Sequence, residues 1–282
     1  MNIVIFLKRY QVLIYFILTF AISWGGFVFV IGPNNFGNAD WQTDAMFPFA
    51  VMAMLSGPTV AGLLMTGVVD DVAGFRKLFS SLFKWRTGIC WYAIAILPAP
   101  FLSVAVLFAL SLTSPIFTAD NKISVLLPGI IAGLTTVFEE IGWTGFAVPK
   151  LRKRCSIFTT GLIVGFLWGV WHLLQQLYIS NTYTGEIHLA LYLSIAIFNA
   201  IAGLTAYRIL LVWIYDHTES LLVTTLMHAS LTASNIFIFR PEATGAHILI
   251  FGLVFAAAQW VLVAVVAIVD KKRLIQQPEI PG

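Results

Sequence analysis

The chain alternates long apolar stretches with short segments rich in turn-forming and basic residues. An apolar stretch of about 20 residues is long enough to cross a bilayer as a helix. A window of helical length predicts eight such spans, near 11–31, 45–68, 90–113, 123–147, 157–179, 187–215, 219–239 and 246–269. We therefore expect an all-α, polytopic integral membrane protein with about eight transmembrane helices.

The composition supports a bilayer as the solvent of this chain. Hydrophobic residues make up 59% of the 282 positions and charged residues only 10%, whereas a soluble domain carries about 25% charge. The net charge of +3 is explained by basic loops, so no nucleic-acid partner is expected. Two cysteines do not suggest a disulfide framework. We expect a single membrane-embedded domain over residues 1–282, with its motif-bearing core near 123–239.

The basic residues predict an orientation. When alternate loops are assigned to one side, fourteen of the sixteen Lys and Arg residues fall together, and only Lys122 and Arg240 fall opposite. Basic loops stay in the cytoplasm, so we expect a multi-pass protein of the cell membrane with both termini cytoplasmic. The fourteen are Lys8, Arg9, Arg76, Lys77, Lys84, Arg86, Lys150, Arg152, Lys153, Arg154, Arg208, Lys271, Lys272 and Arg273.

One segment after the second span has a different pattern. From Asp70 to Trp85, charged residues alternate with Phe and Leu at spacings that place the apolar side chains on one helical face. This pattern is typical of an amphipathic helix lying in the membrane interface.

Four ionisable residues lie inside apolar stretches: Glu139, Glu140, His172 and His228. Ionisable groups at membrane depth are expensive and by default mark a functional site. Successive helical residues point about 100° apart, so Glu139 and Glu140 cannot both face one point. One of the two is expected to do chemistry while its neighbour bonds to the surrounding structure.

The depths of these residues can be compared through the helical rise. Glu139 and His228 lie ~15 Å and ~13 Å from the inner ends of their spans at 1.5 Å per residue. His172 would lie ~24 Å deep if its span begins at Ser156. It matches the other two only if residues 156–161 lie in the interface or if the helix is strongly tilted.

Carboxylates and imidazoles at one depth support several chemistries. A carboxylate beside a histidine can deprotonate a water for hydrolysis, while a second histidine stabilises the oxyanion. A zinc site would need about three protein ligands, and the H-E-x-x-H spacing is absent. Intramembrane acids and histidines also occur in the ion pathways of transporters. A non-catalytic membrane partner protein is the remaining reading.

Three ordered motifs resemble a known family. They are Glu139–Phe146, which reads EEIGWTGF, then Trp168–Leu173, WGVWHL, and Leu226–Ser230, LMHAS. Together they resemble the CPBP family of intramembrane proteases, which includes the CAAX prenyl endopeptidases of the Rce type and the Abi proteins linked to bacteriocin self-immunity. The resemblance implies an endopeptidase that acts on membrane-associated peptide or protein substrates within the lipid bilayer.

The same resemblance implies a role for each matching residue. Glu139 matches the first glutamate of the family motif E-E-x-x-x-R and would be the general base, and Glu140 matches the second and would orient the site. His172 would help to hold the attacking water, and His228 would stabilise the oxyanion. On this reading no cofactor is required, although zinc stays possible.

The chain departs from the family pattern at three positions. Thr144 stands in place of the motif arginine, which leaves Glu140 either protonated or paired elsewhere. Trp168 stands in place of a phenylalanine and keeps an aromatic wall. Thr232 stands in place of an asparagine; it lies at i+4 from His228, on the same helical face, and offers a hydroxyl donor. These departures are the reason to keep a non-catalytic immunity or scaffold protein as the alternative.

Overall fold

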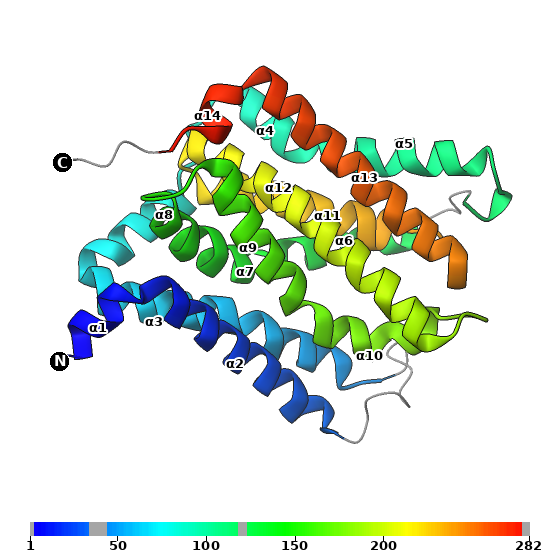
Figure 1. Ribbon diagram of the computed structural model, residues 1–282, viewed down its shortest axis with the longest axis horizontal. Coiled ribbons are helices and arrows are strands. Elements are labelled where there is room, and N and C mark those ends of the chain that lie inside the picture. Colours follow the sequence, from blue (N-terminus) through cyan, green and yellow to red (C-terminus); the bar gives the residue numbers. More distant parts are fainter. Residues whose placement is uncertain (1–2, 34–43, 118–122, 278–282) are drawn as a thin grey trace.

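The computed structural model describes residues 3–33, 44–117 and 123–277, and within these ranges every regular element is helical. Eight helical stretches in the described residues are long and apolar enough to cross a membrane. The predicted all-α polytopic membrane architecture is confirmed, and each predicted span coincides with one of these stretches. Figure 1 shows α2 and α3 along one side of the bundle and α13 along the opposite side, with α7, α9, α11 and α12 between them.

Several spans are built from more than one helix. The principal elements are α2 (Gln11–Ile31), α3 (Phe47–Leu82), α4 (Ile89–Ile96) with α5 (Pro98–Ser111), α6 (Ile123–Thr135) with α7 (Val137–Gly142), η3 (Trp143–Ala147) and α8 (Val148–Leu151), α9 (Ile157–Trp171) with α10 (Leu173–Tyr183), α11 (Leu189–Thr218), α12 (Leu221–Leu231) with η4 (Thr232–Ile238), and α13 (Gly245–Val269). Two of them, η3 and η4, are π-helical. Short helices α1 (Ile3–Arg9) and α14 (Lys271–Ile275) and the 3₁₀ turn η2 (Pro115–Phe117) complete the described chain. A π-helical turn changes which side chains face a neighbour and is often found at functional sites.

The second span ends in a kink. Asp71 has non-helical backbone angles (φ 54°, ψ −149°) and divides α3 into the span and a second limb. This limb corresponds to the amphipathic helix predicted over Asp70–Trp85. Lys150 of α8 donates to Asp70 Oδ1 at 2.6 Å, so the end of the second span, directly before the kink, is tied to the end of the fourth span.

Helices α9 and α11 pack backbone to backbone through a row of small residues. Gly161, Gly165 and Gly169 recur at every fourth position of α9. A Cβ atom at Gly165 would lie 2.6 Å from Cα of Thr205 and 3.0 Å from Cβ of Arg208. Small residues at this spacing let membrane helices approach closely, and here they bring the centre of α11 against the centre of α9.

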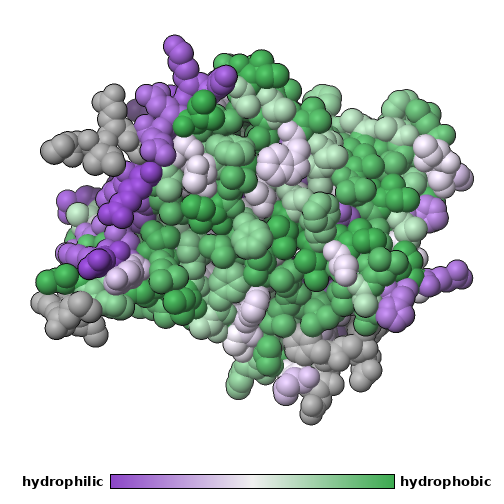
Figure 2. Space-filling model, viewed as in Figure 1, coloured by the Kyte–Doolittle hydropathy of each residue, from purple (hydrophilic) through white to green (hydrophobic). Residues whose placement is uncertain are grey.

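Both described ends of the chain lie at one end of the bundle, next to α8 (Figure 1). Hydrophilic residues are concentrated at this end, and apolar residues cover most of the remaining visible surface (Figure 2). Asp216 binds Arg152 at 2.8 Å and Arg273 at 2.9 Å, which joins three segments of the chain there. Exposed apolar side chains such as Phe101 on the helical surfaces suit contact with lipid tails.

Arg208, which the sequence groups with the basic loops, lies inside a membrane-spanning helix. Arg208 was assigned to a loop, but it lies inside α11 with its side chain fully buried. That assignment was wrong, because a window of apolar residues continues past Arg208 to the end of the helix and the charge faces the bundle interior. Lys122, one of the two residues predicted on the opposite side, lies outside the described residues.

Candidate functional site

The site is formed where three helices meet. Glu139 and Glu140 lie on α7, which is only six residues long and runs directly into the π-helix η3. His172 is the residue between α9 and α10, and His228 lies near the end of α12. The structure therefore brings together the four ionisable residues that the sequence singled out within its apolar stretches.

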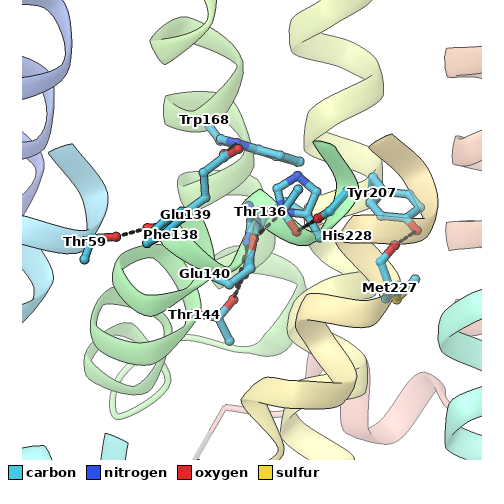
Figure 3. A network of polar contacts seen from close by, with 12 residues as sticks. Thr59, Thr136, Phe138, Glu139, Glu140, Thr144, Trp168, Tyr207, Met227 and His228 are labelled. Carbon is cyan, nitrogen blue, oxygen red and sulfur yellow. Dashed lines mark hydrogen bonds and ion pairs between the residues drawn. The ribbon is translucent and has the colours of Figure 1, made fainter. Parts of the chain in front are cut away.

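The two glutamates point in different directions (Figure 3). Oε2 of Glu139 accepts a 2.7 Å hydrogen bond from Nε1 of Trp168. Glu139 is buried, and Thr59 on α3 donates to the carbonyl oxygen of the residue before it, Phe138. Helix α7 is thus fixed on both sides, by a backbone contact to α3 and a side-chain contact to α9.

Trp168 contacts all three proposed catalytic side chains. Besides its bond to Glu139, its ring lies edge-on to His172 at a centroid distance of 5.6 Å and to His228 at 4.8 Å. The aromatic wall expected at position 168 is therefore present and joins the three motifs.

Both oxygens of Glu140 are occupied. Oε1 lies 2.8 Å from Nδ1 of His228, and Oε2 accepts from Thr144 and, at 2.8 Å, from Arg208. The Glu140 and Arg208 side chains are fully buried. Because both oxygens of Glu140 already accept hydrogen bonds, this carboxylate is suited to orienting His228 rather than to taking a proton from water.

The contacts of the two histidines define which ring nitrogen is available. Nδ1 of His172 lies 2.8 Å from the carbonyl oxygen of Trp168, and Nδ1 of His228 faces the Glu140 carboxylate. Carbonyl and carboxylate oxygens accept only, so both Nδ1 atoms carry the proton. Within the described residues no hydrogen bond occupies Nε2 of either ring. A histidine held in this way presents Nε2 for proton transfer or, when doubly protonated, as a donor.

Comparison with known proteins shows a likeness to one family over part of the chain. Residues 121–234 match the model of the type II CAAX prenyl endopeptidase Rce1-like family, and this range contains every candidate site residue. This part of the chain is similar to the Rce1-like family. The chain is also 37% identical over 54 residues to CAAX prenyl protease 2 of Methanococcus maripaludis. That alignment covers 19% of this chain and 20% of the relative, so the chain spans about a fifth of the length of the curated relative it matches.

The candidate site has its arginine on a helix other than the one that carries the first motif. Where the motif predicts an arginine at position 144, Thr144 donates to Glu140 and accepts from Arg208 at 3.3 Å. Of the two states expected for Glu140, the structure shows the paired one. Sequence reasoning missed Arg208. A signal was available, because Arg208 precedes the end of α11 at Thr218 by ten residues, which is ~15 Å and the depth of Glu139.

Thr232 is placed near the site without being joined to it. It is the first residue of the π-helix η4, four residues after His228, and it is half-buried. Among the described residues no hydrogen bond links its side chain to Glu139, His172 or His228. Its expected role as an oxyanion donor stays a prediction.

The zinc site that the sequence leaves open stays a prediction. No group of three or more His, Cys, Asp or Glu side chains within residues 3–33, 44–117 and 123–277 converges in an arrangement that could hold a metal ion. Both oxygens of Glu140 face protons of His228, Arg208 and Thr144, and one oxygen of Glu139 faces the Trp168 N–H. Zinc in proteins takes about three such ligands.

Proposed function

We propose that the protein is an intramembrane endopeptidase that hydrolyses peptide bonds of membrane-associated substrates with a water activated by Glu139 and His172. The observation that carries the proposal is the contact of Trp168 with Glu139, His172 and His228, which lie on three separate helices. The Rce1-like match over residues 121–234 supports a protease of this class.

In the proposed reaction the attacking water lies between Glu139 and Nε2 of His172. Glu139 takes one proton of the water as its oxygen bonds to the carbonyl carbon of the substrate. The oxyanion that forms accepts a hydrogen bond from Nε2–H of a doubly protonated His228, whose charge is stabilised by Glu140. Thr232 would supply a second donor.

The intermediate then breaks down to products. The carbon–nitrogen bond breaks as the oxyanion re-forms the carbonyl, and the leaving amine takes the proton held by Glu139. Glu139 returns to the carboxylate form and the new carboxyl terminus leaves with the water oxygen. No step requires a metal ion or another cofactor.

A peptide segment at the membrane is the substrate class that suits this site, and the bilayer is the medium in which it is met. We further propose that the protein is a multi-pass protein of the cell membrane with its basic end, and both termini, in the cytoplasm. Basic residues near span ends favour this side.

The test is cleavage of a membrane-tethered fluorogenic peptide library by purified protein in liposomes. Wild type and Glu139→Ala are compared, each with and without a chelator. Cleavage that is lost in the variant and persists in chelator supports the proposal and gives the sequence preference. Cleavage abolished by chelator and restored by zinc would replace the water mechanism with a metal mechanism.

A non-catalytic immunity or scaffold protein of the same fold is the second candidate. The observation that favours it is that Thr144 and Thr232 replace the motif arginine and asparagine. It predicts that folded wild-type protein cleaves no peptide of the library, and that partner binding survives substitution of Glu139.

A further inference from the structure

We propose that Arg208 is a positioning residue of this site: from α11 it takes the place of the arginine absent at position 144 and, by holding Glu140, orients His228. This inference rests on the proposed peptidase function. Arg208 lies outside the three motifs that carry the family resemblance, and it contacts none of the groups assigned to the water or the oxyanion. Its action on the reaction would pass through Glu140.

The first support is the state of Arg208 itself. Its side chain is fully buried inside a membrane-spanning helix, and its Nη1 atom lies 2.8 Å from Oε2 of Glu140. Its guanidinium carbon lies 4.1 Å from the centre of the Trp168 ring. A buried charge in a membrane is retained only where it is paired and useful, and cation–π contact adds to the pairing.

The second support is the order of contacts from Arg208 to His228. Arg208 and Thr144 both donate to Oε2 of Glu140, which leaves Oε1 for Nδ1 of His228. A carboxylate held at one oxygen by two donors cannot rotate freely. The partners of Oε2 therefore set the direction of Oε1. Oε1 in turn sets the orientation of the His228 ring by accepting from its Nδ1–H.

The third support is the space at position 144. Thr144 is fully buried, and its hydroxyl lies between Glu140 and Arg208. The hydroxyl oxygen is 3.3 Å from Nη1 of Arg208. An arginine at this position would bring a second positive charge to the same carboxylate oxygen. A short residue at 144 and an arginine at 208 are thus complementary. With arginine at neither position the Glu140 carboxylate would be buried without a cation, and with arginine at both it would face two.

The experiment exchanges the arginine between the two helices. Arg208→Met removes the charge with little change of volume, Thr144→Arg adds the motif arginine, and the double variant moves the arginine from α11 to η3. Arg273→Met is the matched control, because Arg273 forms its ion pair with Asp216 at the basic end. Each variant is assayed for kcat and KM on a tethered peptide that the wild type cleaves, and for its melting temperature.

Each single variant is expected to lower kcat by roughly 100-fold with KM within about threefold, because the substrate-binding surface is unchanged. The double variant is expected to recover kcat to within about tenfold of wild type. Arg273→Met should retain wild-type kcat. Arg208→Met with unchanged kcat, or a folded double variant no better than Arg208→Met, would overturn the inference. If Arg208→Met does not fold, the double variant alone decides: activity supports the inference, and inactivity or failure to fold overturns it.

A second readout does not depend on turnover. Nitrogen-15 NMR of histidine-labelled protein detects the Nδ1–H group of His228 and its hydrogen bond, in the singly or the doubly protonated ring, and His228→Gln assigns the signal. The Nδ1–H signature is expected in wild type, lost in Arg208→Met and restored in the double variant; an unchanged signature in Arg208→Met would overturn the inference. If the wild type cleaves no peptide, the proposed function fails, and this signature still decides whether Arg208 orients His228.

Discussion

The indole nitrogen of Trp168 donates a 2.7 Å hydrogen bond to Oε2 of Glu139. The same ring lies edge-on to His172 and His228 and beneath the guanidinium of Arg208. Trp168 thus fixes the relative positions of the proposed base, the proposed water-holding histidine and the proposed oxyanion donor.

The ring of Trp168 should matter more than its N–H group. Trp168→Phe keeps the aromatic wall, as in the family motif, and loses one hydrogen bond worth about 1.5 kcal/mol, so we expect kcat to fall by no more than about tenfold. Trp168→Ala removes the aromatic wall and should lower the free energy of unfolding by ~3–5 kcal/mol. Peptide cleavage should be lost as well. Melting temperature and peptide cleavage by the two variants check this. Equal loss in both variants would show that the hydrogen bond, not the ring, is essential.

The close approach of α9 and α11 should be necessary for the site. A Cβ atom at Gly165 would lie 2.6 Å from the Thr205 backbone, so Gly165→Ala should separate the helices at the level of Arg208 and cost about 1–3 kcal/mol. Gly25→Ala is the control, because nothing lies within 4 Å of a Cβ atom there. Equal melting temperatures and activities for the two variants would contradict the packing described.

Restoring the family asparagine should improve turnover. Asn in place of Thr232 would replace the hydroxyl donor with the longer amide donor of the family motif, and one well-placed oxyanion donor is worth on the order of 100-fold in rate. We expect Thr232→Asn to raise kcat by roughly tenfold to 100-fold. The rise in kcat should disappear when Glu139→Ala is added. An unaltered kcat in Thr232→Asn would show that threonine at this position does not limit turnover.

The spans were predictable because each is a continuous apolar run bounded by turn-formers or basic residues. Ser156, for example, begins α9 as its N-cap, accepting a hydrogen bond from the backbone N–H of Thr159. The breaks within spans were not predicted. The helix is interrupted at His172 without a proline or glycine at that position, and the apolar periodicity of the chain carries no signal for the π-helical turns η3 and η4.

The four ionisable site residues were predictable because charge inside an apolar run is conspicuous. Arg208 has the same property, but the charge bias groups it with the basic loops because such a bias counts basic residues by side and ignores their depth in a span. The pairing of Glu140 with Arg208 across 68 positions depends on the packing of α11 against α9. Neither motif spacing nor periodicity reports a contact of that kind.

The proposed orientation can be tested by labelling single cysteines. Cys90 and Cys155 are free and are first replaced by serine. Thr244, exposed at the start of α13, and Lys272, at the basic end on α14, then receive one cysteine each. A membrane-impermeant maleimide should label position 244 in intact cells and position 272 only after the cells are permeabilised. The reverse pattern would place the basic end outside.

The most direct test of the proposed peptidase is the single-turnover cleavage rate of Glu139→Gln. Glutamine keeps the size of the side chain and an oxygen that can accept from Trp168, but it cannot take a proton from water. The account predicts a rate at least ~100-fold below wild type, as expected for loss of a general base. The control Glu186→Gln, at an exposed position, should retain the wild-type rate. Wild-type cleavage by folded Glu139→Gln would contradict water activation by this glutamate.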